Sequence, residues 1–409
     1  MKEDIPIFIH SLFRAGSTYL FHVFRRSRHG YCCYQEPLHE SPFFAKNEPT
    51  ALLDSFGEAE AKLNRHPELC SPYFQELYDA WPAWQGAITE PIIYDAYFAG
   101  DDQDIGIPYW QILSQASHGQ PVFQECRTSG RIGAIKRRMG GYHIYLWRNP
   151  WDQWWSYKVT PYFDTANQLI IHALNAPDPL RQLLASLDLP VYEKGDLAGA
   201  FEFYAARPLK SEDSYLVFYI LWCLALHEGT QHADCMLNID RLSDSPDYRA
   251  EVLMQWQRAG IDGLEFSDCS IPQSRYNKRD VEFFSPLEET VHRRLREGGW
   301  SQERVNEIQK IRSGFTPSCW QETLSSPALT DAIEQTTRAR MLTLRYEDNA
   351  AFFWCKASQA ETRAQALEQR AEEAKTWAQT LEQRAAEAET RAQTLEQRAD
   401  EAETRAQTL

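Results

Sequence analysis

The sequence predicts an α/β fold, in which a central parallel β-sheet is flanked by helices and is followed by a C-terminal coiled-coil helix. Short apolar runs that suit buried strands alternate with helical patterns. Two of these runs end in polar segments that lead directly into a helix, as in open α/β sheets. Near the end of the chain, the string LEQR recurs at Leu367, Leu381 and Leu395. We therefore expect one large domain over residues 1–355 and a heptad-repeat helix over residues 356–409.

The composition and charge of the chain disfavour several classes of protein. The 409 residues are 43% hydrophobic and 13% aromatic, enough for a large core. The formal charge of 42 − 58 = −16 disfavours nucleic-acid binding, so a phosphate ligand would need a local basic pocket. The nine Cys have no metal-type spacing, which predicts reduced thiols and a cytoplasmic location. We expect no membrane span, because no leader-like start is present and the longest apolar run, Tyr215–Leu226, is too short.

The first strand-to-helix junction predicts an anion site. An apolar strand is expected over Ile5–Ile9 and a helix over Thr18–Arg26, with a short loop between them. A helix that begins here directs free N–H groups and the positive end of its dipole at the loop. The loop adds a cation, a glycine and two hydroxyls, in the order Arg14, Ala15, Gly16, Ser17 and Thr18. It is not a Walker A loop, because Ser17 stands where Lys is required.

A carboxylate follows the second expected strand, Tyr31–Gln35. Pro37 should bias Glu36 to an extended conformation and so place the carboxylate at the strand end, beside the loop. Glu36 is then either a functional base or a cap for the next segment. The aromatic-rich residues 41–119 are expected to form helices and loops that cover the sheet. Trp81 and Trp84 in this part either stack on a sugar or belong to the core.

The second junction closes a β-α-β unit. Strands are expected over Val122–Glu125 and Tyr142–Trp147, with a basic helix over Thr128–Met139 between them. Arg148 follows the second strand, Pro150 opens the next helix, and Ser156 lies within that helix. An Arg and a Ser so placed can converge on one phosphate.

The remaining elements complete the sheet. Residues 164–226 should be helical, Met236–Ile239 a late strand, and the segment up to Ala259 a helix. We expect no metal site, since the neighbouring His227 and His232 are five residues apart, a poor spacing for two ligands on one helical face. Residues 285–313 have charged helical patterning.

These motifs resemble those of sulfotransferases that use 3′-phosphoadenosine 5′-phosphosulfate (PAPS), whose fold is similar to that of P-loop proteins. The matching strings are Arg14-x-Gly16-Ser17-Thr18, Glu36-Pro37-Leu38 and Arg148-x-Pro150 with Ser156 eight residues after Arg148, and the resemblance covers roughly residues 5–263. It is closest to carbohydrate-type and bacterial members. The string LRYED at residues 344–348 also occurs in the family, but it comes later than expected.

The resemblance implies a role for each motif. Residues Arg14 to Thr18 would bind the 5′-phosphosulfate, with Arg14 catalytic as well, and Arg148 with Ser156 would bind the 3′-phosphate. Glu36 would take the proton of an acceptor hydroxyl or amine, on a carbohydrate or glycoconjugate, and no metal would be needed. Arg127 or Arg131, expected on one helix face, would reach the nucleotide or stay in solvent. A basic loop at residues 274–279 would fold over the nucleotide.

Two other functions stay open at this point. One is a P-loop-type small-molecule phosphotransferase, although the P-loop Lys is missing. The other is a non-catalytic coiled-coil scaffold with a degenerate sulfotransferase domain, although a scaffold has no need to keep Arg14, Glu36, Arg148 and Ser156.

The repeat predicts a parallel homo-oligomer. With position a set at Ala364, every a position is Ala and the d positions alternate between Ala and Leu. Arg is at the g positions 370, 384, 391, 398 and 405, and Glu is at the e positions 368, 382, 389, 396 and 403. Arg384 of one chain can therefore meet Glu389 of a parallel partner. A solvated single helix is the alternative.

Overall fold

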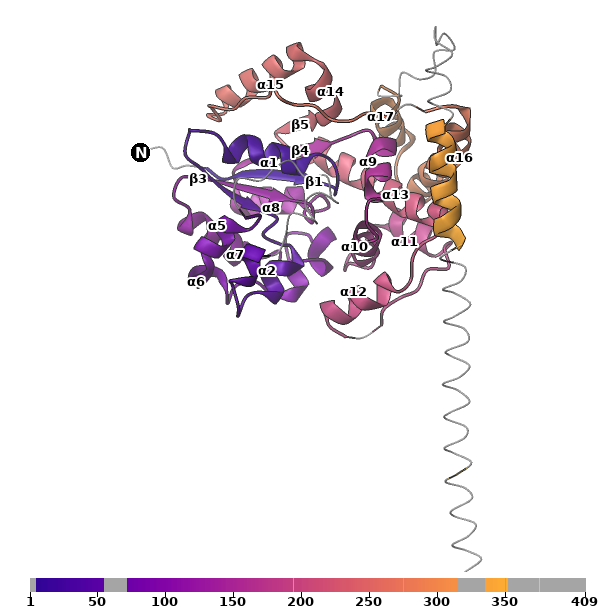
Figure 1. Ribbon diagram of the computed structural model, residues 1–409, viewed down its shortest axis with the longest axis horizontal. Coiled ribbons are helices and arrows are strands. Elements are labelled where there is room, and N and C mark those ends of the chain that lie inside the picture. Colours follow the sequence, from indigo (N-terminus) through magenta and orange to yellow (C-terminus); the bar gives the residue numbers. More distant parts are fainter. Residues whose placement is uncertain are drawn as a thin grey trace, which may run out of the picture. The chain divides into compact units, whose positions relative to one another are not determined.

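The structure is a computed structural model that describes residues 5–54, 72–193, 195–274, 276–314 and 335–349, together with Ala351 and Lys375. The chain divides into two compact units, Met1–Asn349 and Ala350–Leu409. The fold described below is that of the first unit (Figure 1). The predicted coiled coil of residues 356–409 lies outside the described residues, apart from Lys375.

Five parallel strands form the central sheet, in the spatial order β2-β3-β1-β4-β5. Their bounds are β1 Ile7–Ser11, β2 Tyr31–Gln35, β3 Gln120–Glu125, β4 Tyr142–Trp147 and β5 Cys235–Asn238. The predicted α/β class with a parallel sheet flanked by helices is therefore confirmed. Strand β1 lies in the middle, where Ile7 is in register with Val122 of β3 and Tyr142 of β4. All five residues of β1 are buried, as expected for a strand covered on both faces.

Most predicted strand positions agree with the structure to within two residues. Strands β2 and β4 have the predicted bounds, whereas β1 begins at Ile7 and not at Ile5, whose side chain is 47% exposed. Strand β4 begins at Tyr142, opposite Ile7, and the paired residues of β1 and β3 also start at Ile7 and Val122. The helix expected from Thr128 begins only at Ile132.

Helices cover both faces of the sheet (Figure 1). On one face, α1, α14 and α15 pack on Ile7 and Ile9 through residues such as Phe24 and Trp256. On the other face, α7 packs on Phe8 through Trp110, and α8 and α13 pack on β4. The bounds of the helices up to β4 are α1 Ser17–Arg25, α2 Glu40–Phe44, α3 Ala51–Asp54, α5 Gln75–Asp79, α6 Trp81–Trp84, α7 Ile107–Ala116 and α8 Ile132–Met139.

Further helices surround this core. Residues 164–226, predicted as helical, contain parts of four helices separated by loops. The bounds after β4 are α9 Pro150–Tyr157, α10 Tyr162–Ile171, α11 Asp178–Leu184, α12 Leu197–Ala205, α13 Ser211–His232, α14 Ile239–Asp244, α15 Pro246–Arg258, α16 Lys278–Glu297 and α17 Gln302–Ser313. A last helix, residues 335–349, is drawn in orange beside α16 in Figure 1.

The aromatic-rich segment after β2 covers the sheet, as predicted, in the parts that the structure describes. Trp84 is fully buried and its indole N–H donates to the carbonyl oxygen of Leu77 at 2.7 Å. Its side chain therefore belongs to the core and is not a surface for stacking a sugar. Trp81 is partly buried and donates to the carbonyl oxygen of Lys46 at 2.8 Å.

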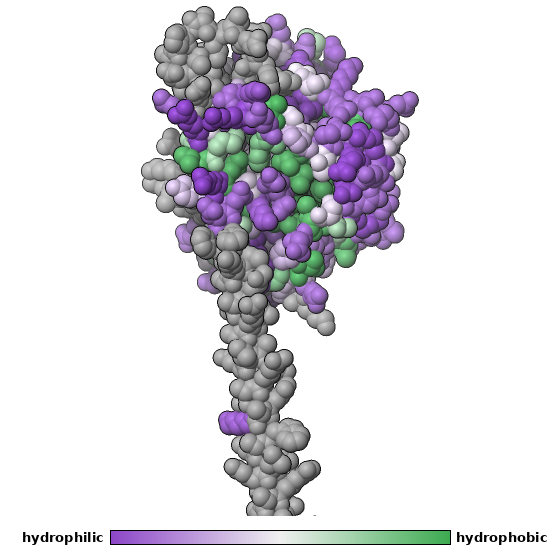
Figure 2. Space-filling model, turned by 90° about the vertical axis from the view of Figure 1, so that its right-hand side faces the viewer, coloured by the Kyte–Doolittle hydropathy of each residue, from purple (hydrophilic) through white to green (hydrophobic). Residues whose placement is uncertain are grey.

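One face of the molecule is mainly polar. Figure 2 shows charged and polar side chains over much of one face, with smaller apolar patches between them. Within the described ranges, we find no helix with the length and apolar character that crossing a bilayer requires.

Candidate functional site

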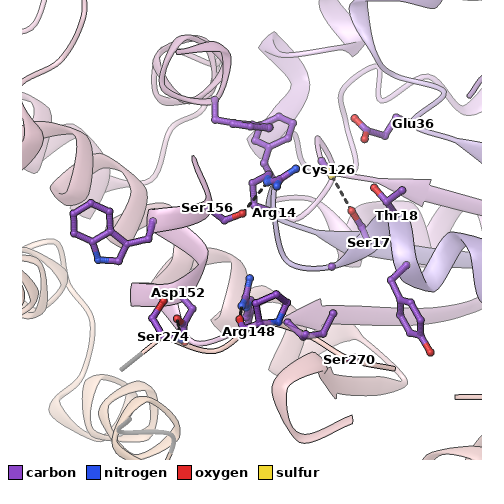
Figure 3. A pocket seen from close by; sticks show the side chains of 17 residues that line it. Arg14, Ser17, Thr18, Glu36, Cys126, Arg148, Asp152, Ser156, Ser270 and Ser274 are labelled. Carbon is purple, nitrogen blue, oxygen red and sulfur yellow. Dashed lines mark hydrogen bonds between the residues drawn. The ribbon is translucent and has the colours of Figure 1, made fainter. Parts of the chain in front are cut away.

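A cavity of about 430 Å³ opens beside the carboxyl ends of β1 and β4. In open α/β sheets, ligands bind at this edge. Seven of the eight site residues predicted from the sequence line the cavity: Arg14, Gly16, Ser17, Thr18, Glu36, Arg148 and Ser156. Segments that are far apart in the sequence therefore contribute to one site (Figure 3).

The loop after β1 has the backbone geometry of an anion cradle. Gly16 has φ 92°, in the left-handed region, and is the N-cap of α1. A Cβ at Gly16 would lie 2.9 Å from Cγ1 of Ile239, so a larger residue would meet the start of α14. Ser17 and Thr18 lie in the first turn of α1, next to its free N–H groups. The side chain of Ala15, the eighth predicted residue, is buried in the core and does not line the cavity.

Arg14 connects the two predicted phosphate motifs. Its Nε donates to Oγ of Ser156 at 2.9 Å, and its guanidinium carbon lies 5.4 Å from the centre of the Phe163 ring. The backbone of Arg14 has φ 61°, which is unusual for a residue with a side chain. A strained conformation of this kind is typical of functional sites. Figure 3 shows Arg148 on one side of the Arg14–Ser156 pair and Glu36 on the other.

Arg148 is held at the end of β4 by a carboxylate and a carbonyl. Its Nε donates to Oδ1 of Asp240 at 3.2 Å, and its Nη2 donates to the carbonyl oxygen of Pro272. Oδ2 of Asp240 accepts the backbone N–H of Asn149 at 2.8 Å. Burial raises the pKa of Asp240 to about 6, although Arg148 and this N–H partly oppose the shift. Asp240 thus orients the guanidinium of Arg148, and burial makes the ionised form of Asp240 less stable than it would be in water.

One wall of the cavity comes from the segment before α16. Ser270, Ile271, Pro272 and Ser274 line it. Oδ1 of Asp152 accepts the backbone N–H of Ser274 and the hydroxyl of Tyr276, both at 2.8 Å. Asp152 lines the cavity too, so it ties this wall to α9.

The predicted basic loop at residues 274–279 is only partly a loop. Asn277 caps α16 in a capping box, so Lys278 and Arg279 are already helical. The Lys278 side chain is 85% exposed and, like Arg279, does not line the cavity. Arg275 lies outside the described residues. The observed contribution of this segment is therefore its backbone and the side chain of Ser274.

Glu36 lies at the opposite end of the cavity from Arg148. Its φ is 39°, so the predicted extended conformation is wrong. The preference imposed by Pro37 is overridden because both carboxylate oxygens are held by buried partners. Oε1 accepts the hydroxyl of Tyr73 at 2.7 Å and Oε2 accepts Nη1 of Arg127 at 2.8 Å. Burial alone would raise the pKa of Glu36, but the opposing effect of Arg127, His39 and Tyr73 is larger, and the net pKa is lowered. The carboxyl is therefore ionised at neutral pH.

The partner of Glu36 was not predicted from the sequence. Arg127 is fully buried, and its Nη2 donates to Oε2 of Glu40 at 2.9 Å and to the hydroxyl of Tyr162 at 2.6 Å. Arg131 is also buried, and its guanidinium donates to two backbone carbonyl oxygens. The predicted shared helical face of these two arginines is wrong, because α8 begins after both, and neither lines the cavity. The sequence did contain a clue to this pairing. Glu36 comes directly after β2 and Arg127 comes shortly after β3, and these two strands are parallel neighbours in the sheet.

Other lining residues also escaped prediction. Phe13, Phe163 and Cys126 also line the cavity. Trp155, which was predicted to be a packing residue, lines the cavity as well. Burial raises the pKa of the Cys126 thiol, which lies 3.7 Å from Oγ of Ser17, so the thiol is neutral.

The cavity thus presents the two cationic groups of Arg14 and Arg148, several hydroxyls, and the two carboxyl groups of Glu36 and Asp152. Within the described parts of the chain, no group of three or more His, Cys, Asp or Glu could hold a metal ion. A neighbouring pair of anionic groups is the ligand that this distribution of charge suits best. Comparison of the chain with protein-family models, with curated proteins and with solved structures gave no match.

Proposed function

We propose that this protein is a sulfotransferase that moves a sulfuryl group from PAPS to an acceptor hydroxyl or amine. One observation carries the proposal. Two motifs that resemble the two phosphate sites of PAPS-dependent sulfotransferases line one cavity, and the candidate base Glu36 lines the same cavity. A surface arginine and an isolated phosphate turn would have no reason to converge in this way.

The proposed roles follow the positions of the residues. Ser17, Thr18 and the first N–H groups of α1 would hold the 5′-phosphosulfate. Arg148 and Ser156 would hold the 3′-phosphate, to which Arg14 is also close because it donates to Ser156. As negative charge develops on the bridging oxygen, Arg14 would stabilise that charge.

The chemical step is a direct transfer. The S–O bond to the 5′-phosphate breaks, and its electron pair leaves with 3′-phosphoadenosine 5′-phosphate. A new S–O or S–N bond forms to the acceptor, whose proton goes to the carboxylate of Glu36. Its lowered pKa keeps Glu36 in the carboxylate form at neutral pH, the form that a base requires. The resemblance to carbohydrate-type members favours a carbohydrate or glycoconjugate acceptor.

Calorimetric titration tests the donor. We expect 3′-phosphoadenosine 5′-phosphate to bind and ATP to bind much more weakly. Arg148→Ala should remove this preference, whereas Arg258→Ala, a control at an exposed position of α15, should keep it. Equal affinity for ATP would favour the phosphotransferase alternative, and binding of neither nucleotide would favour a non-catalytic scaffold.

We also propose that the heptad repeat forms a parallel homo-oligomer, as the Arg and Glu positions suggest. Light scattering of the full chain and of a chain ending at Lys356 tests this. A monomer mass for both would reject the oligomer.

A further inference from the structure

The helix of residues 335–349 contacts the wall of the cavity although it follows α9 by almost two hundred residues. The guanidinium carbon of Arg340 lies 4.5 Å from the centre of the Tyr276 ring and 5.6 Å from the centre of the Trp155 ring. Trp155 lines the cavity, and Tyr276 donates to the cavity residue Asp152. Arg340 itself does not line the cavity, so its effect on a ligand would pass through these two rings.

A buried carboxylate fixes the position of Arg340. Its Nη1 donates to Oδ1 of Asp280 at 3.3 Å, and the Asp280 side chain is fully buried. Oδ2 of Asp280 accepts the hydroxyl of Thr337 at 3.1 Å and the backbone N–H of Asn277 at 2.8 Å. The guanidinium is thus attached to the N-terminus of α16, directly after the wall segment.

A second attachment holds the other end of this helix, at the string LRYED. Nζ of the buried Lys158 lies 3.1 Å from Oε2 of Glu347 and 3.1 Å from Oδ2 of Asp164. The backbone N–H of Ser211 donates to Oδ1 of Asp348 at 2.8 Å. Lys158 follows α9 directly, and α9 carries Asp152, Trp155 and Ser156. Residues 335–349 therefore join α9 to the wall of the cavity.

We propose that Arg340 is a positioning residue of the nucleotide site, which acts on the cavity from outside through Trp155 and Tyr276. Arg340 stacks on Trp155 and Tyr276, and Tyr276 holds Asp152 against the N–H of Ser274. In this way the wall is fixed relative to α9, which carries Asp152 and Ser156. The inference rests on the proposed function, because it assigns the cavity to a nucleotide.

Arg340→Lys is the informative variant. Lysine keeps the charge for Asp280, but it lacks the planar group that stacks on rings. We expect 3′-phosphoadenosine 5′-phosphate to bind about two- to thirty-fold more weakly, the range of a partly buried cation–π contact. The donor KM should rise with it while kcat changes little. Thr337→Val, which weakens the Asp280 junction without touching the rings, and Arg345→Ala, at an exposed position of the same helix, should bind within about twofold of the wild type.

Hydrogen exchange of the nucleotide-free protein gives an independent measurement. In Arg340→Lys, the peptide covering residues 270–274 should exchange faster than in the wild type, while a peptide from α15 should not change. Wild-type affinity and exchange in Arg340→Lys would overturn the inference, as would an equal loss of affinity in Thr337→Val. If the wild type fails to bind the nucleotide, the proposed function falls and the nucleotide role of Arg340 falls with it. In that case, the hydrogen exchange of residues 270–274 tests only whether Arg340 holds the wall of the cavity in place.

Discussion

Nε of Arg14 donates to Oγ of Ser156 at 2.9 Å, across 142 positions of the sequence. The sequence places these two residues in separate motifs, one for each end of the expected nucleotide. The contact shows that the loop after β1 and the helix after β4 form one continuous lining. A phosphate bound by Ser156 would therefore be within reach of Arg14 as well.

Substitutions of Arg14 and Ser156 should not be additive. Arg14→Ala removes a charge and should weaken the binding of 3′-phosphoadenosine 5′-phosphate by about 1.5–3 kcal/mol, and Ser156→Ala by about 1 kcal/mol. Because the two side chains touch, the double variant should lose less than the sum, with a coupling of at least about 0.5 kcal/mol. Calorimetry of the four proteins measures it. Strict additivity would mean that the two residues contact different parts of the ligand.

Glu36→Gln should lower kcat by about 10²- to 10⁴-fold, since the amide cannot take the acceptor proton. The affinity for the nucleotide should change little, because Glu36 lies at the far end of the cavity. Glu40→Gln is the matched control. Glu40 also pairs with Arg127 but does not line the cavity, so its loss of kcat should be tenfold or less. Equal losses in both variants would assign Glu36 a structural role.

Arg127→Ala should destabilise the protein by about 3–5 kcal/mol, because it leaves the buried carboxylates of Glu36 and Glu40 without their cation. Urea unfolding measures this loss. In comparison, Arg137 and Asp101 form an exposed pair, with side chains 52% and 53% exposed. Arg137→Ala should therefore cost no more than about 1 kcal/mol. A similar small loss for Arg127→Ala would show that the two carboxylates are stable without it.

Gly16→Ala should destabilise the protein by about 1–3 kcal/mol and weaken nucleotide binding. The positive φ of Gly16 is costly for alanine, and the added Cβ would lie 2.9 Å from Ile239. Gly86→Ala serves as the control, since its Cβ would meet no atom within 4 Å. Thermal unfolding and calorimetry together test the pair, and a neutral Gly16→Ala would mean that the loop adapts to a side chain.

Nucleotide binding should depend on pH through Asp240, whose pKa is raised to about 6. Above pH 6 its negative charge opposes a phosphate beside Arg148, whereas below pH 6 protonation removes that charge. Asp240→Asn should therefore bind 3′-phosphoadenosine 5′-phosphate more tightly than the wild type at pH 8, by about 1 kcal/mol, and about equally at pH 5. Phosphate itself titrates near pH 6, but the comparison at each pH cancels this effect. Weaker binding by Asp240→Asn at every pH would mean that the loss of orientation of Arg148 outweighs the loss of repulsion between Asp240 and the phosphate.

Local patterns were enough to predict much of the fold. A parallel strand buried on both faces reads as an apolar run, and it ends where a polar residue appears. For this reason β2 and β4 were predicted with their observed bounds, and Arg148 was placed at the end of β4. The same reasoning placed Gly16 before α1, because a helix start requires particular neighbours in the sequence.

The surroundings of Glu36 show where local patterns fail. Pro37 favours an extended Glu36, but Arg127 and Tyr73 hold the carboxylate from elements distant in the sequence. The free energy of that buried pairing exceeds a local backbone preference. A basic string around Arg127 and Arg131 likewise suggests a solvated helix face, and only the packing shows both guanidiniums to be buried.

From its residues alone, the chain could be assigned a parallel α/β sheet with two phosphate-type motifs at strand ends, because those features depend on neighbours within a few positions. The tertiary structure decided which charges meet. It joined Arg14 to Ser156, Glu36 to Arg127 and Arg340 to the wall of the cavity. Such pairs lie far apart in the sequence, and their interaction depends on distance and burial, which arise only when the chain folds.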